Sequence, residues 1–206
     1  MIKTILFDFG NVLGFFDHRR ALSKLKQHTA LETKDLATIL YGGELEIAYE
    51  LGQISTDSYC ASAQQAGQLS CTQEEFLEAF VDIFTLNQPV AALIPRLKPH
   101  YRLVLASNTN EAHFTFYRRQ FAQVLDPFDH LIVSHEIGSR KPHLSFYEKC
   151  HQQARCQPDE CLFVDDLPSN IQAAHKFGWN AVLLNDPLTL IQQMIKHGIQ
   201  GLDDIL

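Results

Sequence analysis

Five short segments rich in apolar residues stand out along the chain, and their apolar residues follow one another instead of alternating with polar residues. They lie at residues 2–7, 102–106, 131–133, 161–164 and 181–184. Continuous apolar runs of this length are typical of strands in a parallel sheet that helices cover on both faces. The pattern therefore predicts five buried, parallel strands.

Helical patterns fill the intervals between the last four runs and follow the last one. They lie at residues 111–122, 142–153, 171–177 and 188–195. Prolines mark the start of the second and fourth patterns, and glycines mark the end of the third and fourth, as expected for helix termini. Strands that alternate with helices in this way predict an α/β fold with a doubly wound, Rossmann-like parallel sheet of five strands.

The interval between the first and second runs is different, because it holds about 90 residues instead of an ordinary crossover. Helical patterns occupy it, at residues 17–27, 45–51 and 57–66, and a capping-box signature at residues 72–75 opens a further one. We expect an all-helical cap domain at residues 15–87, inserted into a core domain formed by residues 1–14 and 88–206. Its hinges are expected near Gly14 and at residues 87–89.

Polar residues follow four of the predicted strands. Asp8 and Gly10 follow the first, Ser107 and Asn108 the second, Lys141 the third, and Asp165, Asp166 and Asn170 the fourth. In an open parallel sheet, ligands bind at the carboxyl ends of the strands, so these residues are expected to meet in one crevice. A divalent cation between Asp8 and Asp166 would relieve the carboxylate repulsion, and oxygen ligands favour magnesium. Ser107, Asn108, Lys141 and the metal would then bind a small anion.

Four motifs in this order make the chain similar to the haloacid dehalogenase superfamily of hydrolases. They read D-F-G-N-V, S-N-T-N, R-K-P and F-V-D-D-x-x-x-N, and they begin at Asp8, Ser107, Arg140 and Phe163. The resemblance covers the whole chain, including a helical cap between the first two motifs. Within the superfamily, the combination most resembles bacterial sugar-phosphate phosphatases of the α-D-glucose-1-phosphate phosphatase type.

This resemblance implies a role for each motif residue. Asp8 would be the nucleophile that takes the phosphoryl group, and Lys141 would neutralise both the nucleophile and that group. The phosphoryl oxygens would bind Ser107 and Asn108. Magnesium would be held by Asp8, the backbone carbonyl of Gly10 and Asp166, with Asp165 as a direct or water-mediated ligand and Asn170 acting through water.

Gly10 departs from the pattern that the resemblance implies. Most phosphatases of the superfamily carry a second aspartate there, which protonates the leaving oxygen and later activates water. A glycine keeps the carbonyl ligand but lacks this acid and base, a loss of about 10² to 10⁴ in rate. We therefore expect a preference for acidic leaving groups, such as sugar 1-phosphates. His18 and Asp17, just beyond the first motif, are the first candidates for a replacement.

The amino-acid composition and charge exclude several classes of binding partner. The 206 residues are 46% hydrophobic and 20% charged, which predicts a folded globular protein, and the net charge of −7 without a basic stripe argues against nucleic-acid or anionic-membrane binding. The longest apolar run, at residues 90–94, is too short to span a bilayer. Without a signal-peptide pattern, and with five cysteines that form no C-x-x-C pair, we expect a cytoplasmic protein with reduced thiols.

Three functions fit these features. The leading one is a magnesium-dependent phosphatase that hydrolyses small phosphate monoesters, sugar phosphates among them, through an aspartyl phosphate. A metal-free hydrolytic dehalogenase is a second, which the pair Asp165 and Asp166 disfavours. The third is a weakly active or non-catalytic binding protein of the same fold, which only Gly10 favours.

Overall fold

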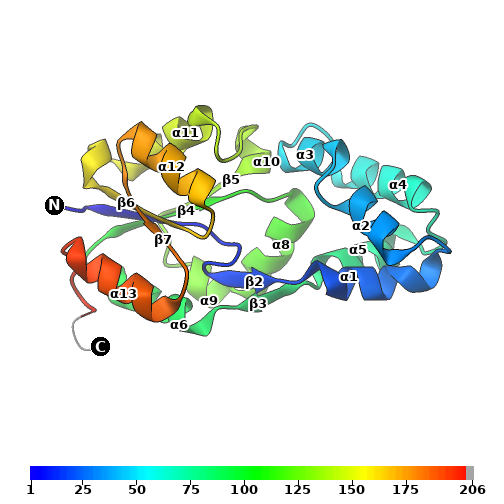
Figure 1. The fold of residues 1–206 in the computed structure, drawn as a ribbon, viewed down its shortest axis with the longest axis horizontal. Helices are drawn as coiled ribbons and strands as arrows, with labels where there is room; N and C mark the ends of the chain where they lie inside the picture. Colours follow the sequence, from blue (N-terminus) through cyan, green and yellow to red (C-terminus); the bar gives the residue numbers. More distant parts are fainter. Residues whose placement is uncertain (203–206) are drawn as a thin grey trace.

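The computed structural model describes residues 1–202 and consists of a sheet flanked by helices and a second, helical part beside it (Figure 1). Five parallel strands form the sheet in the order β5-β4-β1-β6-β7. Their bounds are β1 Thr4–Phe7, β4 Arg102–Ser107, β5 His130–Val133, β6 Cys161–Asp165 and β7 Asn180–Leu183. Each lies within about two residues of a predicted run, and the α/β fold with a five-stranded parallel sheet is confirmed.

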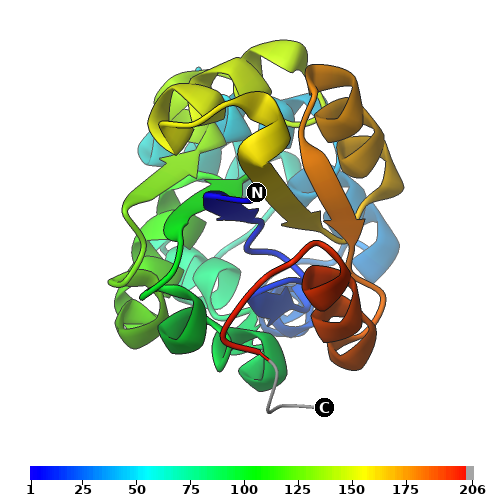
Figure 2. The same ribbon diagram turned by 90° about the vertical axis from the view of Figure 1, so that its left-hand side faces the viewer.

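Side chains alternate across the sheet and build two separate cores. Ile5 and Phe7 of β1 contribute to one core, whereas Leu6 between them belongs to the other. Figure 2 views the sheet from the end at which the N-terminus lies and shows helices on both of its faces. The first core packs against α6 Gln88–Ala91, α7 Ile94–Leu97, α8 Glu111–Gln120, α9 Ala122–Leu125 and α13 Pro187–Lys196; the second packs against α10 Ser134–Ile137, α11 Leu144–Ala154 and α12 Pro168–Phe177.

The helical part has a core of its own. It comprises α1 His18–Leu25, α2 Thr33–Leu40, α3 Glu44–Glu50, α4 Thr56–Ala66 and α5 Gln73–Val81, with a short 3₁₀ turn at Lys26–His28. Their apolar faces meet around Tyr59, Phe76 and Phe80, all fully buried. The capping box is present, because Thr72 and Glu75 exchange hydrogen bonds at the start of α5.

Two short strands join the helical part to the sheet, so the prediction of an all-helical segment from residue 15 to residue 87 is wrong at its two ends. β2 Gly14–Phe16 and β3 Phe84–Leu86 pair in antiparallel fashion. Phe84, which has the spacing of a helical face with Phe76 and Phe80, instead begins β3 and packs edge-on near Phe9. Beside this ribbon, the buried amide of Asn87 donates to the carbonyl of Val12 at 2.9 Å. Strand pairing and this hydrogen bond thus link the two connections between core and cap.

Among the described residues, no helix combines the length and apolar character needed to cross a bilayer. All five cysteines are free thiols, and four are buried.

Candidate active site

The strand order brings the predicted site residues together. β1 lies in the middle of the sheet between β4 and β6, so Asp8, Ser107 and Asp165 stand at the ends of three adjacent strands. Lys141 arrives from the loop after α10. Asp8, Ser107, Lys141 and Asp165 are all buried. Residues that are distant in the sequence therefore meet at one edge of the sheet.

Lys141 is the centre of the site. Its Nζ lies 2.8 Å from Oδ1 of Asp8 and donates a hydrogen bond of 2.7 Å to Oδ2 of Asp165. Burial alone would lower the pKa of Lys141, but the two carboxylates outweigh burial and raise it above its usual value. Lys141 is therefore a fixed positive charge that holds Asp8 in place.

Asn170 orients Asp165. Its side-chain amide donates to both oxygens of that carboxylate, at 2.9 and 3.1 Å, and the backbone N–H of Leu167 donates to Oδ1 at 2.8 Å. The hydroxyl of Tyr147 in turn donates to the Asn170 carbonyl. In this arrangement, the Asn170 amide faces Asp165, and its contact with a metal through water remains a prediction.

Asn108 orients Lys141. The Asn108 amide donates to the carbonyl of Lys141 at 3.0 Å and accepts from its backbone N–H at 2.8 Å. Both polar atoms of this side chain are thereby engaged with the loop that carries the lysine. Phosphate binding by Asn108 and by the buried Ser107 remains a prediction, and the structure adds a positioning role for Asn108 that the sequence did not suggest.

Three carboxylates face one lysine. One oxygen of each of Asp8, Asp165 and Asp166 lies within 4.8 Å of the others. Burial raises the pKa of Asp8 to about 7 despite Lys141, and burial also raises the pKa of Asp166 although the amide of Asn11 donates to it. Since Lys141 and Asn170 already satisfy Asp165, Asp8 and Asp166 are the carboxylates left for a cation. This all-oxygen set fits Mg²⁺.

Gly10, two residues after Asp8, has a φ angle that residues other than glycine also adopt. Its φ lies outside the left-handed region, which Asn11 occupies instead with φ 54°. A Cβ built on Gly10 would approach the ring of Phe16 to 3.0 Å. Because that ring is the end of a half-exposed side chain, the glycine is not required by the fold.

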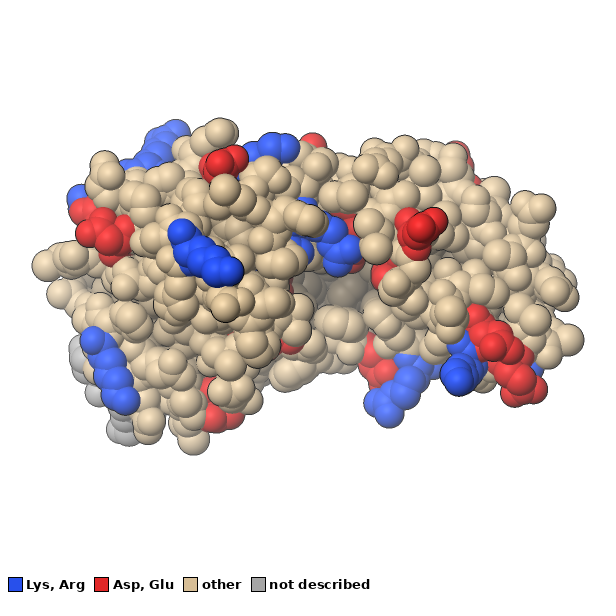
Figure 3. Space-filling model, turned by 45° about the horizontal axis from the view of Figure 1, so that its top comes forward, with Lys and Arg blue, Asp and Glu red and all other residues tan. Residues whose placement is uncertain are grey.

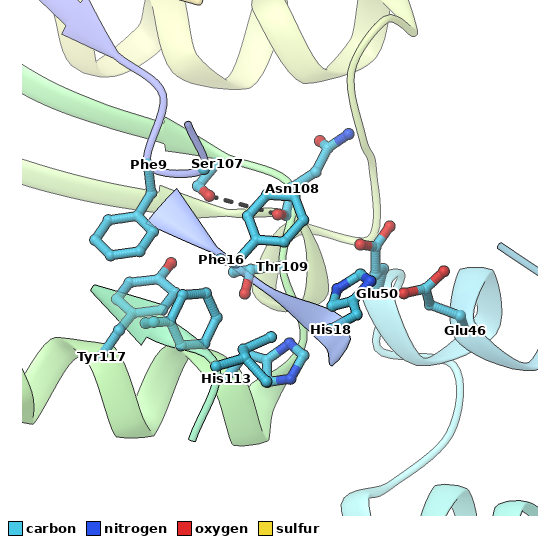
Figure 4. Close-up of a pocket in the computed structure, with 13 residues that line it drawn as sticks. Phe9, Phe16, His18, Glu46, Glu50, Ser107, Asn108, Thr109, His113 and Tyr117 are labelled. Atoms are coloured by element: carbon cyan, nitrogen blue, oxygen red, sulfur yellow. Dashed lines mark hydrogen bonds between the residues drawn. The ribbon is translucent and has the colours of Figure 1, made fainter. Parts of the chain in front are cut away.

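A cavity of about 110 Å³ opens beside the strand ends and reaches the helical part. Gly10, Ser107 and Asn108 line its core side, and His18, Glu46 and Glu50 line its cap side. Figure 4 shows Glu46 and Glu50 projecting from α3 beside His18, with Ser107, Asn108 and Thr109 on the other side. In Figure 3, the surface is hollowed where the two parts meet.

The sequence did not indicate that the two glutamates belong to the site. Their spacing of four residues places them on one face of α3, but such acidic pairs usually face solvent. Of the two candidates named from the sequence, His18 lines the cavity. Asp17 instead caps α1 and pairs with Arg19, which holds the pKa of this exposed carboxyl at about 2. Asp17 is therefore no proton donor at neutral pH.

Comparisons with known proteins agree with this arrangement. A family model described as haloacid dehalogenase-like hydrolase matches residues 2–178. D-ribitol-5-phosphate phosphatase of Bacteroides thetaiotaomicron is 26% identical over 188 residues, covering 87% of this chain and 90% of the relative. A sesquiterpene phosphatase of Aspergillus oryzae is 28% identical over 195 residues, covering 93% of this chain and 94% of the relative.

Solved structures share the fold. One is a haloacid dehalogenase family enzyme from Bacteroides thetaiotaomicron in complex with magnesium and inorganic phosphate, with a TM-score of 0.78, 21% identity and coverage of 89% of this chain and 94% of that chain. Another is L-2-haloacid dehalogenase of Xanthobacter autotrophicus, with a TM-score of 0.66, 16% identity and coverage of 97% and 84%. The family match over most of the chain and the site at the strand ends lead to one conclusion: this protein belongs to the haloacid dehalogenase-like hydrolases.

Proposed function

We propose that the protein is a magnesium-dependent phosphatase that hydrolyses small phosphate monoesters through an aspartyl phosphate on Asp8. One observation carries the proposal: Lys141 joins Asp8 and Asp165 at 2.8 and 2.7 Å, with Asp166 completing the carboxylate cluster. A metal-free dehalogenase has little reason to gather three carboxylates. The two relatives named as phosphatases support the same reaction.

The residue roles that we propose combine this geometry with the motifs of the family. Asp8 attacks phosphorus, the bond from phosphorus to the ester oxygen breaks, and water later cleaves the acyl phosphate. Lys141 favours the ionised form of Asp8 and opposes the charge of the phosphoryl group. Ser107 and Asn108 bind phosphoryl oxygens. Asp8, Asp166 and the carbonyl of Gly10 would hold Mg²⁺, with Asp165 and Asn170 supporting it, and the ion would supply charge neutralisation.

The proposed substrates are small phosphate esters, sugar phosphates among them. A cavity of about 110 Å³ with His18, Glu46 and Glu50 on its cap side gives a leaving group limited space and several polar contacts. A relative named for D-ribitol 5-phosphate supports a polyhydroxylated leaving group.

The test measures inorganic phosphate released from a panel of aryl, alkyl and sugar phosphates, with magnesium and with a chelator. We expect Asp8→Asn to lower kcat at least about a thousandfold, because it removes the nucleophile. Asp126→Asn is the matched control, since this exposed carboxylate pairs only with Arg118 among the ion pairs described. An Asp8→Asn variant within tenfold of the wild type, or full activity in chelator, would refute the proposal.

A further inference from the structure

A phosphate ester with an alcohol leaving group needs a proton donor, because an alkoxide leaves poorly. The donor must line the cavity that Gly10 and Ser107 border at the strand ends, and it must carry a proton at neutral pH. Gly10 has no side chain, and Asp8 and Lys141 are occupied with each other. The remaining ionisable groups that line the cavity are His18, Glu46, Glu50, His113 and Tyr117.

Three of these groups are unsuited. Both ring nitrogens of the buried His113 are engaged, by the amide of Asn110 and the carbonyl of Phe80, and burial lowers its pKa to about 3. His18 stacks on Tyr41 at 3.7 Å between ring centroids, and burial lowers its pKa as well, so both imidazoles are neutral at pH 7. Burial raises the pKa of the Tyr117 phenol far above neutrality.

The two glutamates differ in their hydrogen bonds. One carboxylate oxygen of Glu46 accepts from the backbone N–H of Gly42. Glu50 Oε2 is buried and accepts no hydrogen bond from the residues that the structure describes, although Arg140 lies 3.1 Å away. Arg140 immediately precedes Lys141, so this ion pair fixes Glu50 against the loop that reaches Asp8. Of the two carboxyls, Glu50 is therefore the one with a buried oxygen that is free of hydrogen bonds from the described residues and available to a substrate.

Close packing holds Glu50 in this position. Two residues after it, Gly52 has φ +65° and touches α10 so closely that an added Cβ would lie 2.1 Å from the carbonyl oxygen of His135. The end of α3 is therefore seated directly on the core. The side chain of Glu50 is only 15% exposed, and burial raises its pKa to about 7, with Glu46 adding to this rise while Arg140 and Lys141 oppose it.

We infer that Glu50 is the general acid and base of the reaction, supplied by the cap in place of a side chain at position 10. This inference rests on the proposed phosphatase function. In the first step, the Glu50 carboxyl gives its proton to the ester oxygen as that oxygen leaves phosphorus, so an alcohol departs and Asp8 carries the phosphoryl group. In the second step, the Glu50 carboxylate takes a proton from water, whose oxygen attacks phosphorus. This releases phosphate, frees Asp8 and restores the acid.

The test compares wild type, Glu50→Gln and Glu46→Gln on phosphate esters graded by the acidity of their leaving hydroxyl. For alkyl esters, we expect Glu50→Gln to lower kcat/KM by about 10² to 10⁴, because the acid is lost. For p-nitrophenyl phosphate, whose leaving group needs no proton, the loss in kcat/KM should stay within about tenfold. A burst of p-nitrophenol should also appear in this variant, because hydrolysis of the acyl phosphate is slowed. Glu46→Gln should change kcat/KM by a similar factor for all of the esters.

The pH profile gives an independent readout. Only protonated Glu50 donates in the first step, so the wild-type kcat/KM for alkyl esters should fall as pH rises through about 7, and this decline should disappear in Glu50→Gln. Glu50→Asp, which keeps a carboxyl, should retain the decline. Equal losses on aryl and alkyl esters in Glu50→Gln with an unchanged pH profile would overturn the inference while leaving the phosphatase intact. Absence of phosphate release from every ester by the wild type would instead overturn the proposed function.

Discussion

At the scale of single residues, the structure shows which side chains of the site hold others in position. Lys141 contacts two carboxylates, and two asparagines support this arrangement, since Asn108 fixes the backbone of the lysine and Asn170 fixes Asp165. The motif residues were recognisable from the sequence because each follows a predicted strand. Which side chain faces the phosphate and which faces its neighbour depends on rotamers and hydrogen-bond partners, which sequence spacing does not specify.

Gly10 supports a prediction at this scale. Its backbone has no positive φ, and among the described residues an added Cβ meets only the movable ring of Phe16, so we expect Gly10→Asp to fold. We expect Gly10→Asp, introduced into the Glu50→Gln variant, to raise kcat/KM for alkyl phosphates at least tenfold, because it supplies a carboxyl beside Asp8. Gly10→Asn is the matched control, with the same size but no acid. An equal gain in both variants would show that the effect is not proton transfer.

At the scale of elements, the strands were predicted more accurately than the inserted segment. The five runs of the sheet are continuous because both faces are covered, so their signal is strong. The insertion lacks such a signal: α2 was not identified, and the residues at its two ends form β2 and β3 because each can pair with the other. Glu46 and Glu50 share a helix face that reads as solvent-exposed. This face becomes part of the site only because α3 docks on the core.

The contact between α3 and α10 supports a prediction at this scale. In Gly52→Ala, the new Cβ would lie 2.1 Å from a backbone oxygen, so the end of α3 must move away from the core and carry Glu50 with it. A displacement of about 1 Å can cost about 10²-fold in rate, and we expect a loss of this order in kcat for alkyl phosphates. The measurement is steady-state phosphate release.

Gly42→Ala controls for backbone strain in this experiment. Gly42 also has a positive φ, of +80°, but within residues 1–202 no heavy atom outside its chain neighbours lies within 4 Å of its added Cβ. Both variants should therefore lose about 1 kcal/mol of stability from the left-handed backbone, with a further loss in Gly52→Ala from its overlap with His135, and only Gly52→Ala should lose catalysis. If the two variants had the same kcat, the seating of α3 would have no part in the reaction.

At the scale of the whole molecule, the site joins two parts that have separate cores. Asp8, Lys141 and Asp165 belong to the part that contains the sheet, whereas Glu50 comes from the helical part. The ion pair of Glu50 with Arg140 and the packing of Gly52 connect the two. Under the proposed mechanism, phosphoryl transfer belongs to the core and control of the leaving group to the cap, so changes in the cap should alter substrate preference without removing the nucleophile.

Magnesium should stabilise the entire fold, because its proposed ligands lie on two different strand ends that must be assembled to bind it. Three carboxylates against one lysine leave the site negatively charged, and an ion bound only by the folded state adds RT ln(1 + [L]/Kd) to the free energy of unfolding. At a magnesium concentration of about 100 times Kd, this contribution is about 2.7 kcal/mol. For a chain of this size, each kcal/mol corresponds to roughly 2–4 °C, so thermal unfolding should move upward by about 5–10 °C relative to chelator.

The same measurement on Asp166→Asn identifies the ligand. Removing this half-buried carboxylate takes away one proposed metal ligand and also relieves its repulsion with Asp165. We therefore expect the variant in chelator to be at least as stable as the wild type, and magnesium to raise its unfolding temperature much less. Asp126→Asn, which changes an exposed carboxylate paired with Arg118 outside the cluster, should keep the full magnesium effect. A magnesium-dependent rise of equal size in Asp166→Asn and the wild type would place the ion at other ligands.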